Sequence, residues 1–376
     1  MRIFHYLHYS FYFIFINLII SQSDCNNNRY LEYMYDVNID YDIQYGQNIN
    51  QNIIGNQINQ DLFMNIYYPI NDNYNERPLI FFLFGGSFIS GSKNSPDIIS
   101  LCTKYARMGY VSVAIDYRLS EFLLLTNPSE ENGYKAVLKA IHDLKAAIRY
   151  FRMNDELFDN YGIDQNRIYA GGYSAGAFAC INAAYLNNYE ELPEFIIDDY
   201  ELIGGFEGLS GNPGYESSFN GIINLSGAVG NSNWIVENDI PIVSMHGDQD
   251  DVVPYANDLV TLFGLNIEVD GSYIIHQRML ELGNMSELYT YQNEGHSPYS
   301  DMEFEVNFTS QFLYDIVCGN LLLGDLNNDN LVNVTDIIII VNLILNGDFN
   351  MIGDINADEF LNVLDVIQIV NIILDN

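Results

Sequence analysis

Short apolar runs recur along most of the chain, and most of them end at glycine or at polar residues. Runs of about four to eight apolar residues bounded by turn residues are typical of buried strands. Residues 135–149 carry instead the spacing of a helix. The pattern therefore predicts strands whose ends carry small or polar side chains, within residues 78–84, 109–116, 168–173, 221–228, 241–246 and 288–296.

One of these strands leads straight into Gly172-Tyr-Ser-Ala-Gly176, and small residues then begin a helix. The spacing Gly-x-Ser-x-Gly between a strand and a helix predicts a nucleophile elbow, a turn too tight for bulky side chains beside the serine. Gly172 and Gly176 leave that room, and the turn raises the Ser174 hydroxyl above the sheet. Ser174 is therefore the predicted nucleophile, and the backbone N–H of Ala175 is a predicted oxyanion donor.

A serine nucleophile needs a histidine as its base, and the chain has six histidines. His5 and His8 belong to a leader segment, whereas His142 and His276 lie in helical patterns, with His142 expected at the surface or flank of its helix. His296 follows a strand-like run and precedes Ser-Pro, in a loop where a base can reach the nucleophile. His296 is the predicted base, and the alternative is a loop histidine without a catalytic role.

The acid that orients the base is predicted in the segment that follows the apolar run 241–246. It reads His246-Gly-Asp-Gln-Asp-Asp-Val-Val-Pro254 and resembles the His-Gly-x-x-Asp-x-x-Val-Pro segment of α/β-hydrolases. The resemblance assigns the triad acid to Asp250 and makes His246 a structural histidine. The chain order Ser174, Asp250, His296 is the order of that fold, whereas chymotrypsin-like and subtilisin-like chains have other orders.

The second oxyanion donor is expected after the apolar run 78–84, where Gly85-Gly-Ser87 follows. Many esterases of this kind carry His-Gly-Gly here, and Phe84 stands in the histidine position. Because the donors are backbone N–H groups, the resemblance implies Gly86, with Ser87 as a further candidate. Phe84 leaves open how firmly this loop is held.

Together with Asp116-Tyr-Arg-Leu119, these segments make residues 30–318 resemble a secreted serine esterase of the carboxylesterase or feruloyl-esterase type. Tyr117 and Arg118 are expected to brace the neighbouring loop. The resemblance implies an α/β-hydrolase fold with a mostly parallel, doubly wound sheet over residues 24–319. It also implies acyl transfer through Ser174, which needs no catalytic cofactor.

The C-terminus carries a different pattern, an internal repeat with an offset of 29 residues (354 − 325). Each copy places oxygen-bearing groups at the positions from which an EF-hand-like loop surrounds Ca²⁺. The sequence therefore predicts two structural Ca²⁺ sites. Their predicted ligands are Asp325, Asn327, Asp329, Leu331, Asn333 and Asp336 in the first loop, and Asp354, Asn356, Asp358, Phe360, Asn362 and Asp365 in the second.

An apolar segment follows each loop, at 337–345 and 366–374, and predicts a helix. A duplicated loop and helix of this length resembles a type I dockerin, here a small all-α domain over residues 320–376. The resemblance implies a cohesin domain as partner. The alternative is a Ca²⁺-stapled module for stability or surface retention. Glu359 stands where EF-hands use glycine, which predicts a weaker second site because glutamate disfavours the left-handed conformation.

Composition and the first residues bear on where the protein works. The net charge is −36 with a pI near 4.1, and no basic patch is present, which excludes a nucleic-acid partner. Residues 1–23 read as a signal peptide whose apolar stretch is too short for a membrane span. The sequence thus predicts an extracellular protein, with Cys25 tied to Cys102 or Cys318 and Cys180 buried and free.

Residues 187–219 form an insert that is rich in glycine in its second half, and we expect a loop that rims the active site rather than a helical lid. The prediction as a whole is a secreted carboxylic ester hydrolase that removes acyl groups from decorated polysaccharides, associated with a cell surface or cellulosome. One alternative is a general short-chain carboxylesterase or lipase. Another is a binding or adhesion protein on an inactive hydrolase scaffold, and a third makes the Ca²⁺ module an assembly hub.

Overall fold

The computed structural model describes residues 25, 28–197, 200–261, 264–318, 324–326, 332–346, 350, 352–356 and 360–375. The chain divides into two compact units, residues 27–312 and residues 313–376 together with 1–26. The predicted signal peptide, residues 1–23, lies outside the described residues. Within them, no helix combines the length and the apolar character that crossing a bilayer requires.

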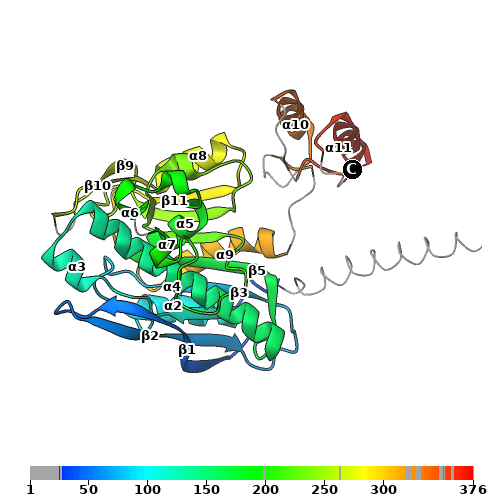
Figure 1. The fold of residues 1–376 in the computed structure, drawn as a ribbon. Helices are drawn as coiled ribbons and strands as arrows, with labels where there is room; N and C mark the ends of the chain where they lie inside the picture. The colour runs from blue at the N-terminus through cyan, green and yellow to red at the C-terminus, as the bar shows by residue number, and fades with distance from the viewer. Residues whose placement is uncertain are drawn as a thin grey trace, which may run out of the picture. The chain divides into compact units, whose positions relative to one another are not determined.

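The first unit is built on one eight-stranded sheet, in the order β1-β2-β4-β3-β5-β6-β8-β11 (Figure 1). The six strands from β4 to β11 run parallel, and β1 and β2 add an antiparallel edge. The predicted mostly parallel sheet is thereby confirmed. The strands are β1 Val37–Gln51, β2 Gln57–Pro69, β3 Arg77–Leu83, β4 Val111–Ile115, β5 Ile163–Tyr173, β6 Ile222–Leu225, β8 Ile242–Gly247 and β11 Ser286–Tyr291.

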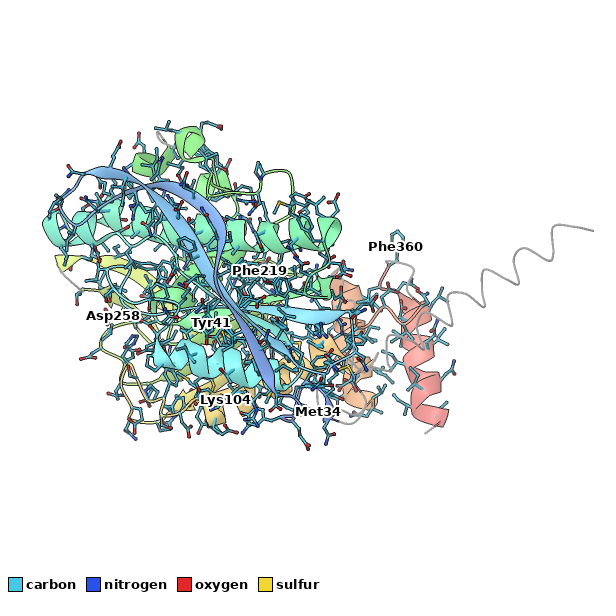
Figure 2. All side chains as sticks on the ribbon, turned by 90° about the horizontal axis from the view of Figure 1, so that it is seen from below. Met34, Tyr41, Lys104, Phe219, Asp258 and Phe360 are labelled. Atoms are coloured by element: carbon cyan, nitrogen blue, oxygen red, sulfur yellow. A yellow bond between two sulfur atoms is a disulfide. The ribbon has the colours of Figure 1, made fainter. Side chains whose placement is uncertain are left out.

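Helices cover both faces of this sheet, which explains why its central strands are continuous apolar runs. Every residue of β3, β4, β6 and β8 is buried. Most residues of the edge strand β1 are half-buried or exposed to solvent, and one of the exposed residues is Tyr41 (labelled in Figure 2). The covering helices are α2 Pro96–Arg107 and α9 Glu303–Val317 on one face, and α4 Glu130–Leu157, α5 Ala175–Tyr185 and α8 Ser272–Glu281 on the other (Figure 1).

The first half of the insert of residues 187–219 holds a 3-10 turn, Tyr189–Glu191, and two one-turn helices, α6 Glu194–Ile197 and α7 Tyr200–Ile203. Its glycine-rich half packs on α4, where the Ser210 hydroxyl donates to Asp143 at 2.6 Å. A Cβ on Gly208 would lie 2.2 Å from the ring of His142. His142 is therefore buried beneath the insert, with Nε2 2.8 Å from the Gly205 carbonyl oxygen, and the prediction of a surface or flank histidine is wrong.

A second, three-stranded sheet lies beside the large one, and the apolar pattern does not predict it. It consists of β7 Ala228–Val229, β10 Ile267–Gly271 and β9 Asn257–Val260, all antiparallel. These strands are short, and β9 is mostly exposed, so they lack a long apolar run. A short helix, α3 Glu121–Thr126, precedes α4, and the apolar pattern does not predict this helix either.

In the second unit, the described residues include the helices α10 Val334–Asn346 and α11 Val363–Asp375, which pack on each other. Both predicted helices are present and begin three residues earlier than the apolar segments suggested. Cys25 and Cys318 form a disulfide, and Cys102 and Cys180 are buried thiols. The structure thus selects Cys318 over Cys102 as the partner of Cys25.

Candidate active site

The elbow between β5 and α5 is shaped by the approach of the neighbouring strand. Ser174 has φ 54° and ψ −120°, a strained conformation for a residue with a side chain. A Cβ on Gly176 would lie 2.1 Å from the Leu83 carbonyl oxygen, and one on Gly172 would lie 2.5 Å from it. Only glycine at both positions lets the end of β3 pass this close to the turn, as the Gly-x-Ser-x-Gly spacing predicts.

Ser174, His296 and Asp250 lie in one hydrogen-bonded chain. The Ser174 Oγ is 2.8 Å from His296 Nε2, and His296 Nδ1 is 2.6 Å from Asp250 Oδ2. The three residues follow β5, β11 and β8, whose carboxyl ends meet at the same edge of the parallel sheet. Because a carboxylate only accepts, Nδ1 carries a proton and Nε2 of the neutral ring is free to accept from the serine hydroxyl.

Asp250 is held as a carboxylate by several donors. Its side chain is fully buried; Oδ1 accepts the N–H groups of Val252 at 2.8 Å and Val253 at 2.9 Å. Burial by itself would raise the pKa of Asp250, but hydrogen bonds from His246 and His296 outweigh it and hold this pKa well below its ordinary value. The acid of the chain is therefore ionised at neutral pH.

His246 contacts the same carboxylate oxygen as His296. Its Nε2 lies 2.9 Å from Asp250 Oδ2 and 3.1 Å from the Val253 carbonyl oxygen, two acceptors that require a proton on Nε2. Its Nδ1 lies 2.7 Å from the Ser272 hydroxyl, which also accepts from Asn224 Nδ2 at 2.9 Å. Sequence reasoning missed Ser272 and Asn224, because no motif marks contacts between separate elements.

The loop that carries His296 is anchored rather than loose. Tyr173, inside the elbow, places its ring 5.4 Å from the His296 ring and hydrogen-bonds to Ser297 through its hydroxyl. Tyr299 donates to the Met245 carbonyl oxygen at 2.8 Å and pairs with the Ser226 hydroxyl at 2.6 Å. The His296 side chain retains an exposure of 14%, so solvent still reaches the site.

The loop after β3 is held by the residue that replaces the expected histidine. Phe84 is buried and stacks on Tyr117 with ring centroids 4.2 Å apart, while the Tyr117 hydroxyl donates to the Phe84 carbonyl oxygen at 2.8 Å. Gly86 follows with φ 125°, and its carbonyl oxygen accepts the N–H of Ile89 at 3.0 Å. The stacking of Phe84 on Tyr117 therefore holds this loop in place of the histidine.

The predicted oxyanion donors border the nucleophile. A Cβ on Gly85 would lie 3.1 Å from the Ser174 Cβ, so this loop runs directly beside the elbow. Within the described residues, no hydrogen bond takes the backbone N–H of Gly86, Ser87 or Ala175. Those three groups remain available to an oxygen atom bound at Ser174. Arg118 ties the segment after β4 to α4, because its Nε and Nη2 both contact the Asp143 carboxylate.

An apolar pocket of about 100 Å³ opens at Ser174. Its walls come from α3, α4, α5 and the β9–β10 hairpin, and no described residue of the insert 187–219 lines it. The insert packs behind this wall, because the ring of Phe195 in α6 lies 5.8 Å from the ring of the lining residue Tyr134, and its place at the rim stays a prediction. The glycine-rich half of the insert lies farther along α4, where Gly208 and Ser210 contact His142 and Asp143, four and five residues beyond the lining residue Leu138.

In the second unit, the predicted Ca²⁺ ligands Asp325, Asp336, Asp354 and Asp365 are buried. Asp336 accepts the N–H groups of Leu326 and Asn333, both at 2.8 Å, which draws the two ends of the loop together. Asp365 closes the second loop in the same way, at Ile355 and Asn362. The remaining predicted ligands divide into Asn333, Asn356, Phe360 and Asn362, which are described, and Asn327, Asp329, Leu331 and Asp358, which lie outside the described residues.

In the sequence every predicted ligand position offers oxygen, and among the described residues one buried carboxylate lies at each end of each loop. Oxygen donors are the ligands that Ca²⁺ prefers, and the binding of Ca²⁺ here stays a prediction. Asn333 and Asn362 also begin their helices, because each side-chain oxygen accepts a backbone N–H, from Thr335 at 2.8 Å and Leu364 at 2.9 Å.

The first unit is similar in part to a known protein family and to a known hydrolase. The family model described as BD-FAE matches residues 64–227. Phenmedipham hydrolase of Pseudarthrobacter oxydans is 31% identical over 119 residues, which make up 31% of this chain and 22% of that protein. The chain thus spans about a fifth of the length of this curated relative.

Solved structures of an esterase share the architecture. Thermogutta terrifontis esterase 2, phosphorylated by paraoxon, aligns with a TM-score of 0.50 at 21% identity, over 72% of this chain and 94% of that one. Its apo form aligns with a TM-score of 0.50 at 21% identity, over 72% and 95%. The first unit therefore has the α/β-hydrolase fold.

Proposed function

We propose that this protein is a serine carboxylic ester hydrolase. The observation that carries the proposal is the chain Ser174–His296–Asp250, in which both hydrogen bonds are formed and the acid is buried and ionised. The matched BD-FAE region and the esterase neighbours support the same reaction class. An inactive binding scaffold has no use for this arrangement, and Phe84, its only support in the sequence, stabilises the loop by stacking on Tyr117.

The reaction follows from the roles that each position allows. His296 Nε2 takes the proton as Ser174 Oγ attacks the ester carbonyl carbon, and Asp250 stabilises the imidazolium that forms. The negative carbonyl oxygen is held by backbone N–H groups, for which Ala175 and Gly86 are proposed, with Ser87 as the neighbouring alternative. His296 then gives its proton to the leaving alcohol. In the second half, His296 takes a proton from the water that attacks the acyl carbon and gives it to Ser174 Oγ as the acid leaves.

The first prediction concerns the nucleophile. Wild-type protein is expected to hydrolyse 4-nitrophenyl acetate or methyl ferulate, and Ser174→Ala to lower kcat by about 10⁶ because the attacking oxygen is lost. Ser100→Ala on α2 is the matched control and keeps wild-type turnover. Turnover that survives in Ser174→Ala, or its absence from correctly folded wild type, refutes the proposal.

For the second unit we propose a Ca²⁺-dependent docking module, with a cohesin-like domain or a cell surface as partner. The support is a duplicated surface: exposed apolar side chains recur at the repeat offset on α10 and α11. They are Val334, Ile338 and Leu345 on the first helix and Val363, Ile367 and Leu374 on the second.

We also propose that the enzyme works outside the cell on acylated polysaccharides. This proposal rests on the leader of residues 1–23 and on the resemblance of residues 320–376 to a dockerin. It concerns the alcohol side of the ester, to which the polysaccharide would belong. A general short-chain carboxylesterase remains the alternative, and hydrolysis of acetylated xylan compared with a free alkyl ester separates the two.

A further inference from the structure

The pocket beside Ser174 follows one helix away from the nucleophile. It is lined from α5 by Ala175, Phe178, Asn182 and Leu186, whose spacing of three or four residues places them on one helix face. At a rise of 1.5 Å per residue, that face extends about 16 Å from the elbow. The pocket is therefore elongated rather than a shallow depression at the serine.

Its position identifies which half of an ester it receives. Ser174, Ala175 and Ser87 line its mouth, whereas His296 is not among the described residues that line it. The leaving alcohol takes its proton from His296 and must face that side chain. The pocket thus lies on the acyl side of the scissile bond.

The walls of the pocket are mostly apolar. Ile267 packs against two apolar clusters, one around Leu265 and one around Val269, and no charged side chain is found among the described lining residues. Asn182 is already satisfied: its Nδ2 donates to the Phe178 and Ala228 carbonyl oxygens, and its Oδ1 accepts the Gly230 N–H. Besides Asn182, the described lining residues with a polar side-chain atom are Ser87, Tyr134, Ser174 and Trp234, so a polar acyl group would leave water for a wall with few polar groups.

We propose that this pocket selects an unbranched aliphatic acyl chain of medium length, from butanoyl to octanoyl, over acetyl and feruloyl groups. The inference rests on the proposed ester hydrolysis and specifies its acyl substrate. Each methylene that leaves water for an apolar wall raises kcat/KM about fourfold until the pocket is full. A feruloyl group gains less, because its phenolic hydroxyl leaves water for a mostly apolar wall.

The chain contains its own reporter of occupancy. Trp234 is its single tryptophan, is largely buried and lines the pocket. A Cβ on Gly230 would lie 2.4 Å from the Trp234 ring, so this wall is closely packed around the indole. Ligand entry therefore changes the intrinsic fluorescence of the protein, with no turnover required.

The first arm of the test uses full-length Ser174→Ala protein, titrated with methyl octanoate and with methyl acetate while Trp234 emission is recorded. A saturable change with methyl octanoate, at concentrations where methyl acetate has no effect, is the expected result. No saturable change with methyl octanoate overturns the pocket assignment, whatever the catalytic activity of the wild type.

The second arm uses wild-type protein with 4-nitrophenyl acetate, butanoate, hexanoate and octanoate, and with methyl ferulate. The expected kcat/KM for hexanoate or octanoate exceeds that for acetate by about tenfold or more. Val137→Phe, at a half-buried wall position on α4, is expected to lower the octanoate-to-acetate ratio. Ile99→Phe on α2, the same kind of enlargement on the other face of the sheet, is the control and leaves the ratio unchanged.

The two arms separate failure of the inference from failure of the proposed function. Fluorescence binding of methyl octanoate without ester turnover by wild type would refute the hydrolase and leave the aliphatic pocket standing. Turnover that is highest for acetate or for methyl ferulate would refute the aliphatic preference and leave the hydrolase standing. A ratio that does not move in Val137→Phe would contradict the placement of the chain along α4.

Discussion

At the scale of single residues, the Asp250 carboxylate is the charge on which the geometry of the site depends. Two histidines and two backbone N–H groups donate to it, so its orientation is over-determined. His246 uses its second nitrogen to accept from Ser272, which fixes one tautomer of a ring in contact with the acid. The neighbouring His296 is thereby presented to Ser174 with its accepting nitrogen forward.

A second residue-scale consequence concerns pH and stability. Burial, with the Arg118 guanidinium nearby, lowers the pKa of His142 to about 4, below its ordinary value near 6.5. Between these values the unfolded chain binds a proton that the folded chain does not, so this residue's contribution to stability is intact above pH 6.5 and falls as the pH drops towards 4.

His142→Gln keeps a donor for the Gly205 carbonyl oxygen and removes the titration. From pH 7 to pH 5, wild type should lose about 2 kcal/mol more free energy of unfolding than the variant. Urea unfolding of both proteins at the two pH values measures the difference. Equal losses would show that His142 is protonated without penalty in the folded protein.

At the scale of elements, the loop after β3 both packs against the nucleophile elbow and carries a proposed oxyanion donor. Its close passage by the elbow requires glycine at positions 172 and 176, and its shape depends on the Phe84–Tyr117 stack. The backbone donors of an oxyanion hole must be fixed before the reaction to be effective. The buried hydrogen bond from Tyr117 to the Phe84 carbonyl oxygen is therefore a determinant of rate as well as of stability.

Tyr117→Phe keeps the stacking ring and deletes that bond. We expect it to lower kcat by about tenfold with little change in KM, because the loss of an oxyanion donor outright typically costs about 10²–10³-fold and this variant only loosens the loop. The unpaired buried carbonyl should lower the free energy of unfolding by about 1–3 kcal/mol. Tyr110→Phe, which removes a buried hydroxyl without a partner among the described residues, is the matched control. An unchanged kcat would show that the loop holds its donors without this bond.

Elements with long apolar runs or a tight turn could be predicted from the sequence, and those set by distant packing could not. The strand into Ser174 and the segments ending at Asp250 and His296 carry local signals, and the structure joins all three side chains. The β9–β10 hairpin has no such run, yet it walls the pocket through Ile267. The insert's glycine content indicated a loop correctly, but only the buried contact of Ser210 with Asp143 shows where it lies.

At the scale of the whole molecule, chemistry and cation binding are assigned to different units. Ser174, Asp250 and His296 belong to residues 27–312, whereas the predicted Ca²⁺ loops belong to residues 313–376. The buried aspartates of those loops carry like charges, and the chain as a whole is strongly acidic. A bound divalent cation would stabilise the second unit by compensating that charge.

Calcium removal with EGTA is therefore expected to lower the thermal transition of the second unit and to leave ester turnover unchanged. At a free Ca²⁺ concentration of about 100 times Kd, the stabilisation amounts to about 2.7 kcal/mol. Asp325→Asn combined with Asp354→Asn should abolish the Ca²⁺-dependent shift in calorimetry. A thermogram that is insensitive to Ca²⁺, or turnover that follows the Ca²⁺ concentration, would contradict this division.

The central claim is that Ser174 is an activated nucleophile, and covalent labelling tests it most directly. Full-length protein is treated with a fluorophosphonate, and the intact mass and the modified peptide are determined. The account predicts one label per chain, located on Ser174, with hydrolysis lost in proportion and no label on Ser174→Ala. Protein that is folded yet unlabelled, or labelled elsewhere while ester turnover continues, would contradict it.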